Sequence, residues 1–484
     1  MGSPQRNRIR FESLKSYMER RLKDFKPTRR DVLALGGAAL AGTWVERLTW
    51  PMNVKAAGKA NPRGTARNCI FVEMGGCISP MECWDLKQTD QTPKDLDPQK
   101  VSSDLYLSKT LFPTMINRMK DVSLVRSMRA SELIHFQGQY HTQTGRALNP
   151  AVAKEIPAFG SVISAELDPR RRDTDRFPSY VSTSLTRARA GSIGSGLFPA
   201  KFTGLDLDPL TVFEAFSGNT DGVNKVLEER WNMLADIAEA SAAERAAIGQ
   251  VTSDYRAYYR EAYGLLNDAR WAKVFKTTEE EKKRYGADEY GTGLILARNL
   301  ISADAGTRFV YVYDGDRWDH HSYIFDHSKP NNHYVTCARF DKGMSALFED
   351  LQKMPGSQPG KTLFDETLIV CTSEFGRTPY FNPVAGRDHH RLAYTSFWAG
   401  GGVKGGRIIG KTDDYGKECI ETGWKHKQQP KHDNTVATIY SALGIDWKKV
   451  ITNTPSNRAY EYTQVAPLSG GEFISDDEIA ELFE

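Results

Sequence analysis

Short apolar runs of strand character alternate with longer runs of helical periodicity through most of this 484-residue chain. Such alternation favours a layered α/β fold, in which helices cover the faces of a mostly parallel sheet. The strand candidates are 69–74, 122–126, 308–313, 367–372 and 394–399. The helical candidates are 108–119, 291–303, 334–353 and 434–443.

One region interrupts this alternation. Residues 209–285 are rich in Ala, Glu and Arg, and their apolar residues recur at helical spacing. We interpret them as a helical insertion of two or three amphipathic helices within a single domain, 61–484. The acidic tail, 475–484, begins with Ser and Asp residues that would cap a short terminal helix.

Composition excludes several classes of protein. Hydrophobic residues make up 40% of the chain, which is enough for a packed core and excludes a disordered or fibrous protein. No apolar run reaches the 18 or more residues of a membrane span, so a multispan membrane protein is excluded. The net charge of +3 comes from residues 1–30, which hold ten Lys/Arg and three Asp/Glu. The rest has 54 basic and 58 acidic residues and a net charge of −4, so we expect no nucleic-acid partner.

The N-terminal region has the pattern of an export signal. Arg29-Arg30 precedes a short Gly/Ala-rich apolar stretch, 34–43, which is typical of a twin-arginine signal. We assign residues 1–60 to this signal and expect a periplasmic or extracellular protein. The alternative is an arginine pair that precedes a buried helix by chance.

A basic amphipathic segment lies ahead of the arginine pair. In residues 9–26 the apolar side chains recur at spacings of three and four, which places them on one face of a helix; they are Phe11, Leu14, Met18, Leu22 and Phe25. Such a helix binds an anionic membrane surface or a protein partner. The alternative is that the segment is an extended part of a discarded signal.

Histidine and acidic residues gather after two strand candidates. Asp319 and His321 follow the strand at 308–313, and two residues of this spacing can chelate one ion from a loop. A solvated polar turn is the competing interpretation. Glu374 stands where the strand at 367–372 ends, and a carboxylate buried there needs either Arg377 or a metal ion as its partner. Asp388-His389-His390 follows shortly after.

The loop after the first strand carries a candidate nucleophile. Paired glycines, Gly75-Gly76, let the backbone approach a charged group, and Ser79 follows them. A plain Ser-Pro turn is the alternative. Six cysteines are too few for a disulfide scaffold, although Cys77 and Cys83 flank this loop and could pair.

Together these stretches resemble an exported bacterial family, domain of unknown function 1501. The matching stretches are Gly75-Gly76 through Lys87, Trp318-Asp319-His320-His321, Ser-Glu-Phe-Gly-Arg-Thr-Pro at 373–379, Gly-Arg-Asp-His-His at 386–390, Thr144-Gly145-Arg146 and the segment 433–446. The resemblance covers about residues 28–450. That family is similar to the alkaline-phosphatase and sulfatase superfamily, which implies a three-layer sandwich with a central, mostly parallel sheet.

The resemblance also implies a chemistry. By position, Asp319, His321, Glu374, Asp388 and His389 would hold a divalent metal such as zinc, calcium, magnesium or manganese, with Ser79 as nucleophile and Arg377 steadying an anion. The first loop departs from the family pattern, because Glu82 replaces an Asp and Cys83 a Thr. Residues 77–81 also lack the Cys-x-Pro-x-Arg order of sulfatases, so a standard sulfatase is not expected.

Two functions are hypotheses at this point. The first is an exported metal-dependent hydrolase of phosphate or sulfate esters, acting on an anionic small molecule or glycan, with Ser79 or water as the attacking group. The second is a catalytically silent structural or binding subunit of an exported or membrane-associated complex. The altered first loop, the helical insertion and the basic N-terminal segment favour the second.

Overall fold

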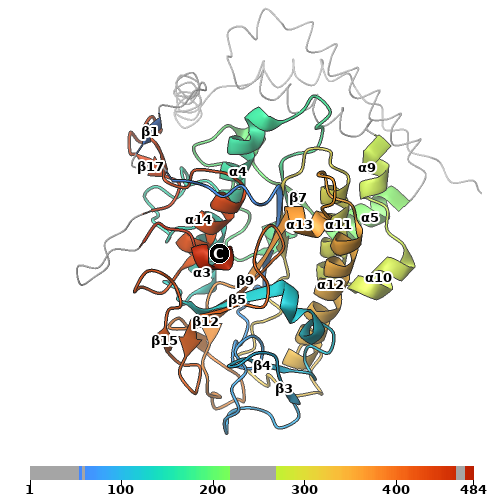
Figure 1. Cartoon of the computed structure of the whole chain (residues 1–484), viewed down its shortest axis with the longest axis vertical. Coiled ribbons are helices and arrows are strands. Elements are labelled where there is room, and N and C mark those ends of the chain that lie inside the picture. Colours follow the sequence, from blue (N-terminus) through green and yellow to red (C-terminus); the bar gives the residue numbers. More distant parts are fainter. Residues whose placement is uncertain (1–53, 57–59, 218–268, 465–474) are drawn as a thin grey trace, which may run out of the picture.

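The structure is a computed structural model that describes residues 54–56, 60–217, 269–464 and 475–484. Its centre is an eight-stranded sheet with strand order β13-β5-β12-β9-β2-β8-β6-β7 (Figure 1). In chain order the strands are β2 (Asn68–Glu73), β5 (Val122–Met128), β6 (Tyr180–Thr183), β7 (Leu205–Leu207), β8 (Phe309–Tyr313), β9 (Thr367–Thr372), β12 (Tyr394–Ala399) and β13 (Ile408–Ile409).

Strand direction in this sheet is mostly parallel. The strands β9, β2, β8, β6 and β7 pair in parallel, and β13 is parallel to β5. Only β12 is reversed among these eight strands, since it pairs antiparallel with both β5 and β9. The predicted α/β class with a central, mostly parallel sheet is confirmed.

The strands are apolar on both faces because helices cover both faces. In β2, Ile70 and Val72 belong to one hydrophobic core, while Cys69 and Phe71 belong to the other. This strict alternation follows from the two-residue period of a strand. Helices α11 (Glu289–Ser302) and α12 (His333–Lys353) contribute to the first core. Helices α4 (Phe159–Leu167) and α14 (His432–Ala442) contribute to the second, so the sheet lies between two helical layers (Figure 1).

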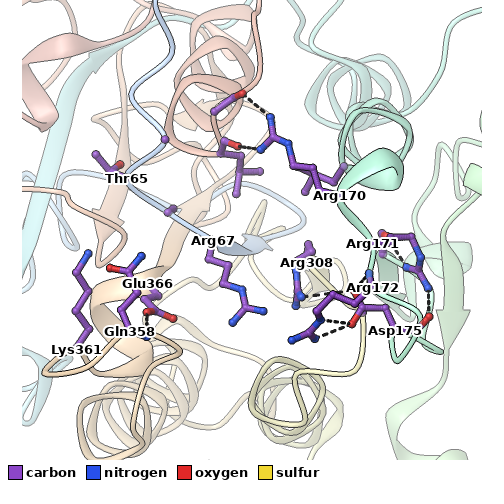
Figure 2. Close-up of a pocket in the computed structure, with 17 residues that line it drawn as sticks. Thr65, Arg67, Arg170, Arg171, Arg172, Asp175, Arg308, Gln358, Lys361 and Glu366 are labelled. Carbon is purple, nitrogen blue, oxygen red and sulfur yellow. Dashed lines mark hydrogen bonds and ion pairs between the residues drawn. The ribbon is translucent and has the colours of Figure 1, made fainter. Parts of the chain in front are cut away.

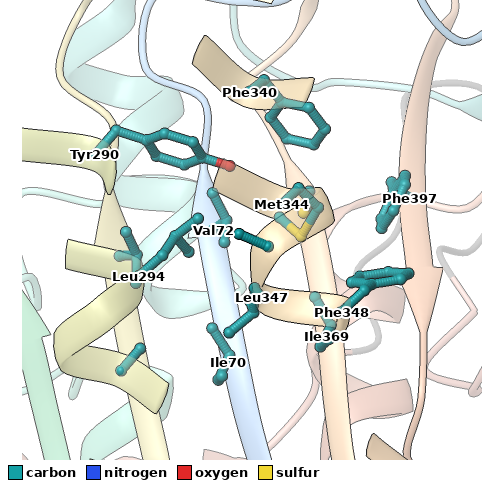
Figure 3. Close-up of a cluster of buried hydrophobic side chains, with 14 of the residues drawn as sticks. Ile70, Val72, Tyr290, Leu294, Phe340, Met344, Leu347, Phe348, Ile369 and Phe397 are labelled. Carbon is teal, nitrogen blue, oxygen red and sulfur yellow. The ribbon is translucent and has the colours of Figure 1, made fainter. Parts of the chain in front are cut away.

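The helices of the described residues are α3 (His135–Thr144), α4 (Phe159–Leu167), α5 (Pro209–Ser217), α9 (Ala269–Val274), α10 (Glu279–Tyr285), α11 (Glu289–Ser302), α12 (His333–Lys353), α13 (Leu363–Glu366) and α14 (His432–Ala442). The longest, α12, begins at an Asn332 cap whose side chain accepts from the Val335 N–H. Figure 3 shows Phe340, Met344 and Leu347 of α12 packed over the apolar face of the sheet.

Most predicted elements exist, but the helix expected at 108–119 does not. Instead, β4 (Tyr106–Ser108) pairs with β3 (Pro98–Lys100), and a 3-10 helix spans Met115–Asp121. Pro113 disfavours the helical conformation at the residue before it, which works against one continuous helix here. The short terminal helix expected in the acidic tail is a 3-10 turn at Ala480–Leu482.

Several predicted features fall wholly or partly outside the described residues. The amphipathic segment 9–26 lies outside them, as does the export signal assigned to 1–60 apart from residue 60 and residues 54–56, which form a strand. Of the predicted insertion, the structure describes only its two ends, which form α5, α9 and α10. In the part of the chain that is described, no helix is both long and apolar enough to cross a bilayer.

Four small sheets complete the described structure. They are β1 (Val54–Ala56) with β16 (Lys449–Ile451) and β17 (Tyr460–Glu461), β3 with β4, β10 (Gly376–Arg377) with β11 (His389–His390), and β14 (Lys411–Thr412) with β15 (Cys419–Glu421). All six cysteines are free thiols. The pairing of Cys77 with Cys83 that the first loop permits is therefore absent.

Candidate functional site

Four strands deliver chemically active residues to one edge of the sheet. Asp319 and His321 follow β8, Glu374 follows β9, and His135 opens α3 shortly after β5 ends. His389 instead precedes β12, and it reaches the same edge because β12 runs in the opposite direction. Residues distant in sequence thus meet at the carboxyl ends of the parallel strands, where α/β sheets bind ligands.

Four of these residues form what we term the histidine group: His135, Asp319, His321 and His389. One ligand atom from each lies within 4.8 Å of the ligand atoms of the others. The Asp319 Oδ1 atom is 3.3 Å from His135 Nε2 and 3.2 Å from His321 Nε2. The Nε2 atoms of His321 and His389 are only 2.8 Å apart.

The proton positions on His321 and His389 follow from their other contacts. The Arg377 Nη1 atom lies 3.1 Å from His321 Nε2, and an arginine can only donate, so this nitrogen carries a lone pair. His389 Nδ1 is 2.6 Å from the carbonyl oxygen of Leu133, so Nδ1 carries the hydrogen. Burial lowers the pKa of His389 to about 4, which keeps its ring neutral and leaves a lone pair on Nε2.

Two lone pairs therefore face each other across 2.8 Å. They repel unless a cation lies between them. The Nδ1 atom of each ring contacts an acceptor on the other side of the ring. His389 Nδ1 contacts the Leu133 carbonyl oxygen, and His321 Nδ1 lies 3.2 Å from Asp388 Oδ1. Metal-ligating histidines typically donate their other N–H to a carboxylate or a carbonyl in this way. The donor set of three imidazoles and one carboxylate thus fits a divalent transition metal such as zinc.

Glu374 lies behind His135 in a second candidate group with Cys77. His135 Nδ1 is 3.5 Å from Glu374 Oε1, and Cys77 Sγ donates to Glu374 Oε2 at 2.9 Å. Gly76 N and Gln139 Nε2 also donate to this carboxylate. Burial alone would raise the pKa of Glu374, but hydrogen bonding and the charge of His135 outweigh it and lower the pKa to about 2.

His135 lies between two carboxylates, those of Asp319 and Glu374. Burial alone would lower its pKa, but hydrogen bonds to Asp319 and Glu374 raise it to about 9. The ring is therefore protonated at neutral pH. A metal ion bound at the histidine group would have to displace this proton, so binding should weaken as the pH falls.

Arg377 is buried and connects several segments of the site. Its side chain is fully buried and pairs with Asp319 Oδ1 at 2.5 Å. It also donates to the carbonyls of Gly76, Cys77 and Arg387. Burial raises the pKa of Asp319, but His135 and Arg377 together bring it well below its usual range. With its donors used inside the protein, Arg377 holds the first loop to the later motifs.

Arg189, which the sequence did not single out, is a partly exposed arginine beside the histidine group. Its side chain is 44% exposed and donates to Asp316 Oδ2 at 2.8 Å and to Asp319 Oδ2 at 2.7 Å. It therefore presents a positive charge beside the histidine group on the open side. Its Nε and Nη2 atoms are used by these two carboxylates, so an incoming anion would meet the remaining Nη1 atom.

Ser79 lies outside the histidine group. Its hydroxyl is buried and donates to Glu82 Oε2. Glu82 in turn forms an ion pair with Arg387 in which both side chains are fully buried. The serine proposed as nucleophile is thus engaged in a buried network in this structure.

The structure therefore brings together part of the predicted set. Asp319, His321 and His389 converge in the histidine group. Glu374 is connected to this group through His135. Asp388, whose side chain is 59% exposed, contacts the solvent-facing side of His321. Sequence reasoning missed the role of His135, although it also follows a strand, which was a usable signal. For the buried Gln139 and the exposed Arg189, no sequence signal distinguishes them from other polar residues.

A separate cavity of about 380 Å³ lies at the opposite edge of the sheet. Arg67 and Arg308, which immediately precede β2 and β8, point toward it (Figure 2). Its other lining cations are Arg170, Arg171, Arg172 and Lys361. Ion pairs join Arg67, Arg172 and Arg308 to Asp304, so much of this positive charge is already balanced within the protein.

Comparisons with known proteins agree with the resemblance noted from the motifs. A family model described as "Protein of unknown function (DUF1501)" matches residues 66–467. Among curated proteins, none matches this chain.

Several solved structures show a distant likeness in fold. One is a protein in the alkaline phosphatase superfamily from Vibrio parahaemolyticus, with 10% identity and a TM-score of 0.37, covering 86% of this chain and 76% of that one. Another is the lipoteichoic acid synthase LtaP from Listeria monocytogenes, with 8% identity, a TM-score of 0.36 and coverage of 86% and 80%. A third is the PsFucS1 sulfatase from a Pseudoalteromonas species, with 9% identity, a TM-score of 0.34 and coverage of 80% and 68%.

Proposed function

This chain belongs to the DUF1501 family, and we propose that it is an exported, metal-dependent hydrolase of phosphate or sulfate esters. The observation that carries the proposal is the pair of Nε2 atoms of His321 and His389, which face each other 2.8 Å apart. The Nδ1 atom of each ring contacts a separate acceptor, Asp388 for His321 and the Leu133 carbonyl for His389. The substrate class comes from the similarity of this family to the alkaline-phosphatase and sulfatase superfamily.

The residues have separate tasks in this proposal. His135, Asp319, His321 and His389 hold the ion, and Asp388 fixes the ring of His321. When bound, a divalent ion supplies Lewis acidity toward an ester oxygen and toward water. The exposed guanidinium of Arg189 binds the anionic ester group at the open side.

Water is the attacking group in this proposal. Ser79 is buried and donates to Glu82, so it is not positioned to reach a substrate at the histidine group. Arg377 is likewise buried, and its task is to hold Asp319 and the first loop rather than to touch the substrate. Arg377 is thus a positioning residue.

The test compares two histidines, each paired with a carboxylate. His321 lies in the site beside Asp388, while His327 is 71% exposed and lies 3.8 Å from Asp95, away from the histidine group. We expect the full-length protein, purified without chelators, to bind a divalent metal. His321→Ala should weaken this binding and His327→Ala should not. Asp388→Asn should weaken it about 10–100-fold, because it removes the group that orients His321.

Hydrolysis of aryl phosphate and aryl sulfate esters is then measured with and without added metals. Turnover that depends on metal and is lost in His321→Ala, but retained in His327→Ala, would support the hydrolase. Equal metal binding by the two variants, or no metal binding at all, would contradict it.

A catalytically silent binding or structural subunit is the second candidate. The observation that favours it is the ion pair between Arg377 and Asp319, which neutralises the group's carboxylate without any metal, together with the buried Ser79. Metal binding without turnover of either ester class would favour this function.

Export and attachment are proposals that rest on the N-terminal sequence. Arg29-Arg30 supports twin-arginine export, and the apolar face of residues 9–26 supports a membrane surface or a protein partner. Replacing both arginines by lysine should leave the protein in the cytoplasm. Deleting residues 9–26 should release it from membranes or from its complex, and unchanged fractionation would contradict that attachment.

A further inference from the structure

A second set of metal-ligating side chains lies apart from the histidine group. Cys83, His333 and Cys337 are all fully buried, and one ligand atom of each lies within 4.8 Å of the other two. We call this set the thiol–imidazole cluster. It shares no residue with the histidine group, so a metal site here would be independent of the proposed hydrolase function.

The fold places these three side chains together by simple rules. His333 and Cys337 are four residues apart at the start of α12, so they lie on the same face of that helix. The Asn332 cap fixes the first turn. Cys83 comes from the loop after β2, the same loop that holds Ser79 and Glu82. The cluster therefore joins this loop to α12.

The distances agree with ligands of one ion rather than with a disulfide. The two sulfur atoms, Cys83 Sγ and Cys337 Sγ, are 3.7 Å apart, and Cys83 Sγ is 3.2 Å from His333 Nε2. A disulfide would need about 2.05 Å between the sulfur atoms. Two thiolates bound to a tetrahedral zinc ion at about 2.3 Å each would be about 3.8 Å apart.

We propose that Cys83, His333 and Cys337 bind a structural zinc ion. Two thiolates and an imidazole are the ligand types that zinc prefers in closed structural sites. Binding releases the two thiol protons to solvent, so the two thiolates balance the charge of the ion. The ion would join the first loop to α12 and so stabilise the loop.

A donor for the fourth position is at hand in His320. Its ring packs edge-to-face against His333, with ring centroids 5.6 Å apart. Its Nε2 atom is buried and, within the described residues, has no hydrogen-bond partner. His320 is not among the residues whose ligand atoms all lie within 4.8 Å of one another, so its ring would have to move toward the cluster to complete a tetrahedral site.

The experiment uses the full-length protein with zinc replaced by cobalt, because thiolate-bound cobalt has an intense sulfur-to-metal charge-transfer absorption. Cys83→Ser and Cys337→Ser are compared with Cys371→Ser, which alters an equally buried cysteine of β9 outside the cluster. His321→Ala is included to separate this site from the histidine group.

We expect the charge-transfer absorption in the wild-type protein, in Cys371→Ser and in His321→Ala. We expect its loss in Cys83→Ser and Cys337→Ser, together with a roughly tenfold or greater weakening of the affinity for zinc. Absence of the band in the wild-type protein, or recovery of a Cys83–Cys337 disulfide by peptide mapping without reductant, would overturn the proposal.

X-ray absorption at the zinc edge covers the case in which the cysteine variants do not fold. Wild-type protein loaded with zinc should show sulfur scatterers at about 2.3 Å. Nitrogen and oxygen scatterers alone would mean that zinc occupies the histidine group only, and would also overturn the proposal.

Discussion

At the scale of single residues, Gly386 decides how closely two motifs approach each other. A Cβ atom at this position would lie 2.0 Å from the backbone carbonyl carbon of His321. This contact brings the segment with Asp388 and His389 against the loop with Asp319 and His321. Glycine at this position is therefore a requirement of packing, because no side chain fits between the two backbones.

We expect Gly386→Ala to destabilise the protein by about 1–3 kcal/mol or more, because the added methyl group meets backbone that cannot turn away. It should also weaken metal binding, since it separates His321 from His389. Gly194→Ala is the matched control, because the nearest atom to its Cβ is Thr203 Oγ1 at 3.9 Å. Chemical unfolding and metal titration measure both effects, and equal results for the two variants would refute this explanation.

The individual residues of the site differ in how well the sequence predicts their positions. Asp319, His321 and Glu374 were predictable because each follows a recognisable apolar strand, and strand ends share an edge. Arg377 was predicted either to pair with Glu374 or to bind a substrate anion, whereas its fully buried side chain pairs with Asp319 and with backbone carbonyls. Which of two charged groups a buried arginine joins depends on loop paths, and a sequence does not contain those paths.

At the scale of elements, strand direction explains the position of His389. The strand at 394–399 was predicted with its observed bounds, but nothing in its residues shows that it runs opposite to its neighbours. A parallel strand would have carried His389 to the far edge of the sheet. Local patterns thus predicted that the element exists, while its direction depends on pairing with β5 and β9 across the whole sheet.

Helix α12 is the element whose packing is most readily tested. Leu347 is fully buried between this helix and the sheet (Figure 3), while Val335 of the same helix is 42% exposed. We expect Leu347→Ala to reduce the free energy of unfolding by about 2–5 kcal/mol, because it leaves a cavity in the core.

Val335→Ala is the control for this change and should alter the stability by no more than about 0.5 kcal/mol. Unfolding by denaturant at constant pH measures both variants. A loss below about 1 kcal/mol for Leu347→Ala would show that this layer of the core is looser than the structure indicates.

At the scale of the whole molecule, buried neutral histidines make stability depend on pH. Burial, and then the neighbouring His141, lowers the pKa of His432 from an ordinary 6.5 to about 4. The unfolded chain therefore takes up a proton at this residue before the folded protein does. The stability that His432 contributes is complete above about pH 6.5 and is lost as the pH falls toward 4.

We expect this one residue to account for about 3 kcal/mol of the loss in stability between about pH 7 and about pH 4. His432→Gln keeps a side-chain donor for the Glu374 carbonyl, which His432 Nε2 contacts at 3.0 Å, but it cannot titrate. Its stability should fall less steeply with acid than that of the wild-type protein. Parallel slopes for the two proteins would contradict the assignment.

The order of strands in the sheet also bears on when the site can exist. The strands β2, β8 and β9 are neighbours in space, yet long stretches of chain separate them, and each carries part of the site. Contacts of this kind form late, because closing long loops costs chain entropy before any contact repays it. Uptake of a divalent ion during refolding would therefore report the last step of assembly. It would start only after the secondary structure has formed.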